Sequence, residues 1–145
     1  MNRAEIGDLL GELLPVADPP YDAPSNQSWA QLQHRINGTF PSEFVDFMDA
    51  MAGFEFPGDI FNISEEGRTN GNDTIFRVYE IESQQGEWPP WLIPFYGIGN
   101  GDYFGLDLRI EGKSEVYYWY HDRLAAEKYS ASFEEWLRGL KSFLS

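Results

Sequence analysis

The stretch IPFYGIGNGDYFGLDL, residues 93–108, places two apolar runs on either side of closely spaced glycines. Glycines at this spacing can bind a phosphate or turn the chain. A phosphate-binding loop needs a helix after the glycines, and a P-loop also needs a lysine. Here no lysine follows, and residues 102–108 alternate as a strand does. The pair Asn100-Gly101 between apolar runs is instead typical of a hairpin with a type I′ turn. The sequence therefore predicts a β-hairpin and no nucleotide site.

Short aromatic and β-branched runs around this hairpin predict further strands. The expected strands cover residues 54–56, 59–63, 74–79, 92–98, 102–108 and 115–121. The gaps between them are too short for crossover helices, so the strands should be mainly antiparallel. The strand at 115–121 is aromatic on both faces, and its second face therefore needs a cover. The candidates are the N-terminal helix, a second copy of the chain and a partner, and we favour the N-terminal helix.

Apolar residues at helical spacing predict helices on both sides of these strands. Residues 1–14 indicate a short amphipathic helix, and the proline-rich residues 15–28 indicate an extended tether. A second helix is expected to begin at Ser28, where the S-x-x-Q form favours a capping box. A third is expected to begin at Pro41, and a last one follows Ser132, which opens another capping-box pattern.

These elements predict the fold class and the organisation of the chain. We expect an α+β fold, a mainly antiparallel sheet of about five to six strands with helices packed at the N-terminal and C-terminal ends, in a single domain. Residues 1–28 should form the N-terminal helix and tether, and residues 29–145 the α+β domain. A chain of 145 residues without cysteine can bury enough surface to fold without a disulfide or a metal.

The charge and the hydropathy of the chain exclude some functions. The formal net charge is −14, which argues against nucleic acid as a partner, because a binder must neutralise phosphates. The same charge favours a basic partner through electrostatic steering, although solubility alone is an open alternative. No segment approaches the ~20 apolar residues of a membrane span or has the apolar core of a signal peptide. We therefore expect a cytoplasmic protein, and the lack of cysteine suits a reducing compartment.

Four stretches, taken in order, resemble one known family. Trp29 precedes a helix and Gly38, and is followed by FPSEFVDFMDAMAGFEF. The later stretches are LIPFYGIGNGDYFGLDL, EVYYWYHD and SFEEWLRGL. Together they are similar to the SUKH superfamily, which includes fungal cell-wall-assembly regulators and bacterial immunity proteins. The chain departs from the family in having Tyr120 where an aspartate usually precedes the acid–histidine step, and residues 1–28 lie outside the resemblance.

The resemblance implies a function as well as a fold. It implies a cytoplasmic immunity protein without catalytic apparatus, which binds a polymorphic toxin, often a nuclease, and blocks it. The expected partner is thus a basic protein toxin domain, with no nucleic acid, no membrane and an undetermined oligomeric state. The alternative is a scaffold or regulatory module of the same fold with an unrelated protein partner. A third hypothesis is a hydrolase that uses paired acids and His121.

The candidate partner-binding residues are acidic side chains and one tryptophan, the residue types that guide association and form interface anchors. The full set is Asp59, Glu65, Glu66, Asp73, Glu82, Glu87, Trp88 and Asp122. Three of its acids lie in the polar stretch at 64–73, and loops of this length are often functional. For Trp88 an exposed interface anchor and local packing are both open, whereas Trp91 is expected to be buried.

The dipeptide His121-Asp122 is the most enzyme-like feature. A metal site needs three or four converging ligands, and the only other histidine is His34. We interpret His121 as a strand-end residue that is hydrogen-bonded to its surroundings. The sequence therefore predicts no catalytic, cofactor-binding or metal-binding residues.

Overall fold

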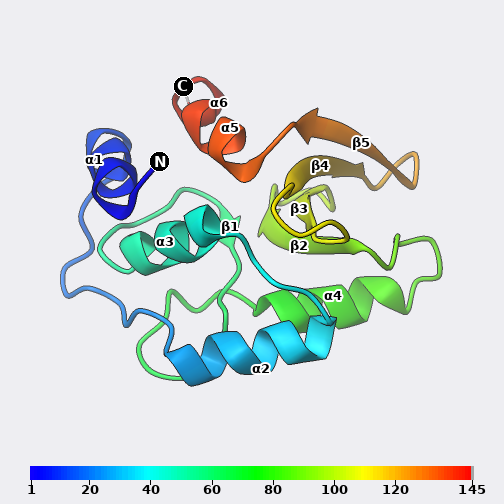
Figure 1. Cartoon of the computed structure of the whole chain (residues 1–145), viewed down its shortest axis with the longest axis horizontal. Coiled ribbons are helices and arrows are strands. Elements are labelled where there is room, and N and C mark those ends of the chain that lie inside the picture. Colours follow the sequence, from blue (N-terminus) through cyan, green and yellow to red (C-terminus); the bar gives the residue numbers. More distant parts are fainter. Residues whose placement is uncertain (145) are drawn as a thin grey trace.

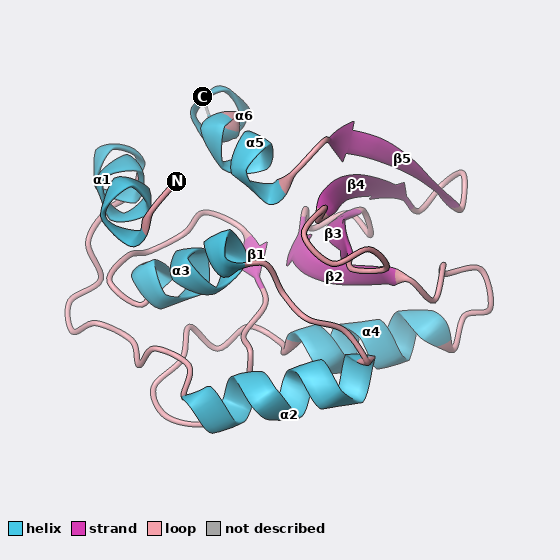
Figure 2. Ribbon diagram, viewed as in Figure 1, coloured by secondary structure: helices cyan, strands magenta, loops and turns pink. Residues whose placement is uncertain are grey.

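The computed structural model describes residues 1–144 of the chain, with the sheet lying between helices (Figures 1 and 2). Its elements are α1 (Arg3–Leu13), α2 (Asn26–Ile36), α3 (Ser42–Met51), β1 (Asp59–Ile60), α4 (Ile75–Ser83), β2 (Leu92–Gly97), β3 (Tyr103–Asp107), β4 (Glu115–Tyr120), β5 (Ala125–Ser130), α5 (Phe133–Arg138) and α6 (Leu140–Leu144). The strands form one antiparallel sheet in the order β1-β2-β3-β4-β5. The predicted α+β fold is confirmed.

The main core lies on the sheet face that α3 and α5 cover. Phe104 and Leu106 of β3 pair with Tyr118 and Val116 of β4, so these four side chains share that face. Against them pack aromatic rings from the helices, such as the stack of Phe133 on Trp136 and the edge contacts of Phe104 with Trp136 at 5.7 Å. Burial of these rings is the main stabilising contribution to the fold.

The opposite face of the sheet is covered by α4 and the segment that follows it, as Figure 1 shows for α4 and β2. Trp88, Leu92 and Trp119 are buried there, with Tyr79 and Tyr103 packed around them. Gly105 in β3 permits this packing, because a Cβ at that position would lie 2.6 Å from the Leu92 side chain. The expectation that the N-terminal helix covers this face is wrong.

Helix α1 packs on α3 instead. Its side chains Ile6 and Leu10 are fully buried in the main core. The capping box at its start is formed by Asn2 and Glu5, which exchange hydrogen bonds of 3.1 and 2.9 Å. Helix α1 is therefore part of the same core as the rest of the chain.

Two of the expected strands are absent. Residues 74–79 begin α4, because the Thr74 hydroxyl caps the Arg77 N–H at 3.2 Å and the spacing of Ile75 and Val78 buries one helical face. Residues 54–56 form no strand, and only Asp59–Ile60 of the 59–63 stretch pairs in the sheet. Strand β5 was not predicted, because its central residues are exposed and charged, as is usual at a sheet edge.

The helix starts and the central turn also differ in detail from expectation. Ser25, rather than Ser28, caps α2, whereas Ser132 caps α5 as expected. The β2–β3 hairpin is confirmed, but its turn is not type I′. Positive φ occurs at Gly99 and Gly101, while the Asn100 side chain accepts from the Asp102 N–H at 2.9 Å.

Candidate functional site

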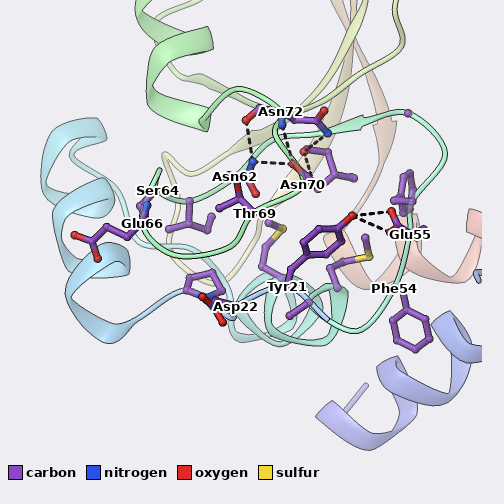
Figure 3. A pocket seen from close by; sticks show the side chains of 18 residues that line it. Tyr21, Asp22, Phe54, Glu55, Asn62, Ser64, Glu66, Thr69, Asn70 and Asn72 are labelled. Atoms are coloured by element: carbon purple, nitrogen blue, oxygen red, sulfur yellow. Dashed lines mark hydrogen bonds between the residues drawn. The ribbon is translucent and has the colours of Figure 1, made fainter. Parts of the chain in front are cut away.

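The polar loop between β1 and α4 carries Glu65 and Glu66, and hydrogen bonds hold this loop in place. Figure 3 shows Asn62, Asn70 and Asn72 bonded to one another, with the Asn62 amide donating to Asn70 at 2.8 Å. The asparagine amides also donate to the carbonyl of Ile60. Both glutamates are exposed on this loop. The loop that carries the two glutamates is therefore held in one conformation by side-chain hydrogen bonds and is not a simple solvated hairpin.

A small polar pocket of about 150 Å³ lies beneath this loop. Figure 3 shows the Tyr21 hydroxyl at its wall, where it donates to both oxygens of Glu55 at 2.8 Å. That hydrogen bond raises the pKa of Tyr21. The methionines of α3, Met48 and Met51, also line the pocket. Sequence reasoning did not identify this pocket, because residues 21–24 meet the distant stretch 48–72 only in the folded chain.

Glu65 and Glu66 share their surroundings with basic groups. A depression of about 370 Å³ between α2 and α4 is lined by both glutamates and also by Arg35 and Arg77. The Arg77 side chain lies 3.5 Å from Asp73 in an exposed ion pair. Positive and negative charges are therefore mixed around Glu65 and Glu66, which weakens the attraction of this part of the surface for a basic partner.

A second group of candidate residues surrounds the Tyr103 hydroxyl. Tyr103 donates to Glu82 Oε1 at 3.1 Å. Burial, assisted by the nearby charges of Glu82, Asp73 and Asp59, raises the pKa of Tyr103 to about 12. Tyr103 therefore stays neutral at physiological pH and orients Glu82. Of the candidate acids, the structure thus brings Glu82 into direct contact with the Tyr103 hydroxyl, whereas Asp59 and Asp73 act on it only through their charge.

Beside Tyr103 lies a groove of about 360 Å³, which we call the Trp88 groove. Its lining residues are Glu82, Gln85, Glu87, Trp88, Gly101, Trp119, His121 and Leu124. Trp88 is only 5% exposed, so local packing is the correct one of the two interpretations, and its assignment as an exposed partner-binding anchor is wrong. Its ring lies 5.0 Å from that of Trp119, and its indole N–H donates to the Leu92 carbonyl at 2.9 Å. Trp88 therefore supports the groove from within the fold.

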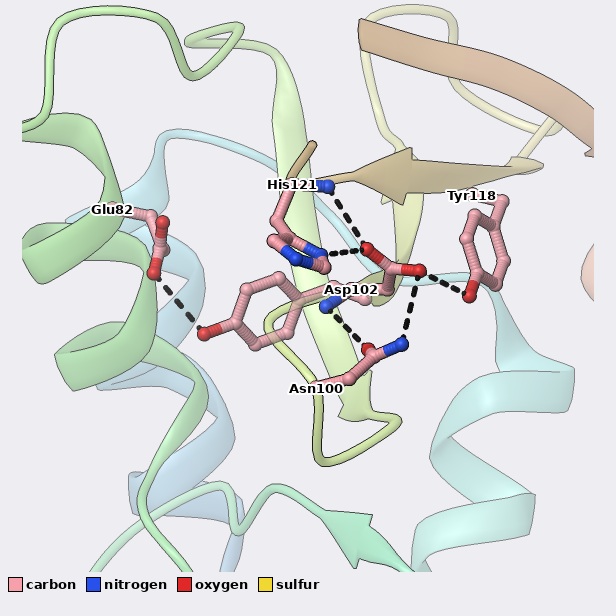
Figure 4. A network of polar contacts seen from close by, with 6 residues as sticks. Glu82, Asn100, Asp102, Tyr118 and His121 are labelled. Atoms are coloured by element: carbon pink, nitrogen blue, oxygen red, sulfur yellow. Dashed lines mark hydrogen bonds and ion pairs between the residues drawn. The ribbon is translucent and has the colours of Figure 1, made fainter. Parts of the chain in front are cut away.

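Asp102 joins the turn that carries Gly101 to His121, and both of these residues line the Trp88 groove; Figure 4 shows the polar contacts of Asp102. Asp102 accepts hydrogen bonds from the Tyr118 hydroxyl at 2.7 Å and from the His121 N–H at 2.9 Å, and the His121 ring Nδ1 lies 2.6 Å away. Burial alone would raise the pKa of Asp102, but these hydrogen bonds outweigh it and lower the pKa below its usual value. Asp102 thus joins the β2–β3 turn to the end of β4.

His121 has the structural role that the sequence analysis assigned to it. Its ring pairs with Asp102, and a Cβ at Gly101 would lie 3.1 Å from that ring, so the turn and the histidine pack closely. The neighbouring Asp122 is exposed at the β4–β5 turn. Burial and the hydrogen bond to Asp102 raise the pKa of Tyr118, and the charge of Asp122 adds to this. Across residues 1–144, histidines and acids form no group of three that could hold a metal ion.

Trp91 lies at the far end of the same sheet face and is only partly buried, so the expectation that it is buried is not met. The Arg109 guanidinium lies 4.1 Å from the centre of its ring. The same guanidinium donates to both oxygens of Asp107, at 3.0 and 2.8 Å. We call this arrangement the Trp91 corner. Here an acid and a tryptophan already hold a cation from the chain itself.

The acids of the Trp88 groove have no such internal partner in the described part of the chain. The basic side chains that form ion pairs with acidic side chains include Arg77, Arg109, Arg123, Lys128 and Arg138. None of their partners is Glu82 or Glu87, and no ion pair to either glutamate occurs within residues 1–144.

Among the same residues, no helix has the length and apolarity that crossing a membrane requires.

Comparison with known proteins is consistent with the fold. A family model described as SUKH_6, SMI1-KNR4 cell-wall, matches residues 26–137, from the start of α2 into α5. Eleven chains of solved structures match. One, described as the crystal structure of a protein from Pseudomonas syringae pv. tomato, has a TM-score of 0.65 and 16% identity over 93% of this chain and 95% of that chain. At this identity the likeness concerns the fold alone. No curated protein matches the chain.

Proposed function

This chain belongs to the SUKH (SMI1-KNR4 cell-wall) family, and on that premise we propose that it is a cytoplasmic immunity protein. It binds a cognate polymorphic toxin domain, most simply a basic nuclease, and blocks the toxin by protein–protein contact. Its role is binding, and the chain supplies no chemistry of its own. The partner is recognised through carboxylates that the fold leaves without internal counter-ions.

The observation that carries this proposal is the unneutralised acidic surface around the Trp88 groove. Glu82 and Glu87 line the groove and have no internal ion pair in the described residues, whereas Asp73 is already paired with Arg77. A nuclease must carry basic residues to bind phosphates. Such a surface is electrostatically complementary to the acidic groove, so complementarity would raise the association rate and suppress wrong partners.

The support for these acids also favours a binding role. Tyr103 orients Glu82, and Asp102 holds the opposite rim through Tyr118 and His121. Groups that are oriented before association lose less conformational entropy when a partner binds. The fold thus presents preorganised carboxylates at this groove.

The test uses the toxin domain that is encoded beside the gene for this chain. We expect tight binding by isothermal titration calorimetry, an association rate that falls as salt rises, and rescue of cells that express the toxin. Absence of both binding and rescue would overturn the proposal. Binding of an unrelated endogenous protein, without rescue, would instead support a scaffold role for the same fold.

A further inference from the structure

We propose that the Trp88 groove binds an arginine side chain of the partner. This inference deepens the proposed function and rests on it, because it names the group through which a basic toxin domain would be recognised. The guanidinium would lie between Glu82 and Glu87, with its apolar stem against Leu124 and the tryptophan floor. Three features of the groove support this occupant: its carboxylates, its aromatic walls and its size.

The carboxylates come from the end of α4 and the segment after it. Glu82 lies in the last turn of α4, which ends at Ser83, and Glu87 follows a few residues later on the exposed surface. The carbonyl end of a helix carries partial negative charge and favours a cation. Glu82 is oriented by Tyr103, so one of the two acceptors has a defined direction before a ligand arrives.

The walls of the groove are apolar and aromatic. Trp88 and Trp119 form the floor of the groove with only 5% and 3% of each residue exposed, and Leu124 on the rim is 53% exposed. Most of the apolar contact for an arginine stem would therefore come from Leu124. A planar, weakly hydrated guanidinium is easier to bring against such an apolar surface than a compact, strongly hydrated ammonium, and it can pair with two carboxylates at once.

The Trp91 corner shows that this chain already uses the same combination. There, Arg109 stacks over Trp91 and pairs with both oxygens of Asp107. Both sites lie on one face of the sheet, and both tryptophans flank the same two prolines. The Trp88 groove repeats the acid and the tryptophan but has no arginine among its lining residues, which leaves the place of the cation open to a partner.

The groove is large enough for a single side chain. Its volume of about 360 Å³ is at the low end of sites that enclose small molecules. The rim is held by Asp102, which accepts from the Tyr118 hydroxyl and from the His121 N–H. Because both turns are tied to one buried carboxylate, the groove keeps its shape without a ligand, as a preformed pocket for one anchor residue does.

The experiment titrates the full chain with the peptide acetyl-Gly-Arg-Gly-amide and follows amide and indole N–H resonances by NMR. We expect shifts at the indoles of Trp88 and Trp119 and at the Gly101 amide. A matched peptide with citrulline, which keeps the shape but lacks the charge, should bind at least fivefold more weakly. The lysine peptide should lie between the two.

A pair of variants tests the carboxylates. In the E82Q/E87Q variant, the new amide oxygen at position 82 can still accept from the Tyr103 hydroxyl while both negative charges are lost. The arginine peptide should therefore bind at least fivefold more weakly to this variant. The control E12Q/E111Q makes the same charge change at exposed glutamates outside the groove and should bind as the parent does.

Two results would overturn the inference: equal binding of the citrulline peptide, or unchanged binding in the E82Q/E87Q variant. Failure here is separable from failure of the proposed function. If the neighbouring toxin still binds and is neutralised while the peptide does not use the groove, the anchor is wrong and the immunity role stands. If the peptide binds the groove but no toxin is neutralised, the groove stands and the immunity role fails.

Discussion

The Trp88 groove and the Trp91 corner lie on the same sheet face, and each combines a tryptophan with carboxylates. At the Trp91 corner the chain supplies Arg109, which holds the carboxyl of Asp107 and keeps the pKa of that carboxyl below its usual value although burial alone would raise it. At the Trp88 groove no lysine or arginine is among the lining residues. The comparison teaches that total negative charge is a poor guide to a binding surface, because only a carboxylate that the fold leaves unpaired is available to pair with a basic partner.

The two tryptophans also differ in what they do for the fold. Trp88 contacts Trp119 and Tyr103, with ring centroids at 5.0 and 5.6 Å, and is nearly inaccessible. Trp91 contacts Tyr117 at 4.9 Å and remains partly exposed. We therefore expect Trp88 to be a structural residue that shapes a binding groove, and Trp91 to be a surface residue whose contacts are local.

The largest effect is expected when each tryptophan is replaced by alanine, because the two replacements should differ in their cost to stability. Trp88→Ala should lower the free energy of unfolding by about 3–5 kcal/mol, because a buried indole and its contacts are lost. Trp91→Ala should cost about 1–2 kcal/mol, the value of one aromatic pair and one cation–π contact. Urea denaturation measures both. Equal losses would show that the two tryptophans do not differ as the structure indicates.

The second prediction concerns Asp102, the carboxylate that supports the rim of the Trp88 groove. Asp102→Ala leaves the Tyr118 hydroxyl and the His121 N–H without their acceptor and should cost about 2–3 kcal/mol. Because folding lowers the pKa of Asp102, its contribution is fully present above the unfolded value of about 3.9. It is lost as the pH falls through the lower folded pKa.

The difference in stability between the parent and Asp102→Ala should therefore be nearly constant from about pH 5 to 7 and shrink below about pH 4. Denaturation curves at a series of pH values measure it. The Asp107→Ala variant is the matched case at the Trp91 corner, since the pKa of Asp107 is also lowered, there by Arg109. A difference that grows toward low pH would contradict the assignment for Asp102.

The third prediction compares acids that differ in internal pairing. The E82K/E87K variant should weaken toxin binding at least tenfold, about 1.4 kcal/mol, because it reverses the unpaired carboxylates of the groove. The E65K/E66K variant should weaken it less, since Arg35 and Arg77 already lie beside those glutamates. Calorimetric titration of each variant at two salt concentrations measures the effect. The reverse order of affinities would move the interface to the polar loop.

The smallest effect should come from opening the Trp91 corner. Arg109→Ala should lower the free energy of unfolding only slightly, since the guanidinium is exposed and its contacts are at the surface. The loss also vacates a site with an acid and a tryptophan. The arginine peptide should then perturb the Trp91 indole in NMR spectra of this variant, whereas the parent shows no such shift. If it does not, an acid beside a tryptophan is insufficient to bind arginine here.

Local patterns in the sequence predicted much of the fold. Apolar periodicity located α1, α2, α3 and α5, and the glycine-rich stretch located the β2–β3 hairpin. The two misses have different causes. Residues 74–79 contain the β-branched and aromatic types of a strand, which favour that prediction although the spacing of Ile75 and Val78 also fits a helix. Strand β5 has a charged, exposed centre, and only its pairing with β4 makes it a strand.

For the candidate site, only the type of residue could be predicted from the sequence. The sequence indicated that acids would attract a basic partner, and it included Glu82 and Glu87 in the expected set. It could not show which acids are already paired. Ion pairing depends on side-chain positions within about 4 Å, and these follow from strand register and helix packing, as with Arg109 and Asp107 or Lys128 and Glu115.

By itself the sequence determined the fold class, the central hairpin and the excess of negative charge, because periodicity, turn chemistry and composition are local or additive properties of the chain. The tertiary structure alone decided that Trp88 is buried, that α4 rather than α1 covers the second face of the sheet, and that the acids of one groove remain unpaired within residues 1–144. The reason is that burial and charge compensation depend on which distant segments meet, and only the packed fold specifies those contacts.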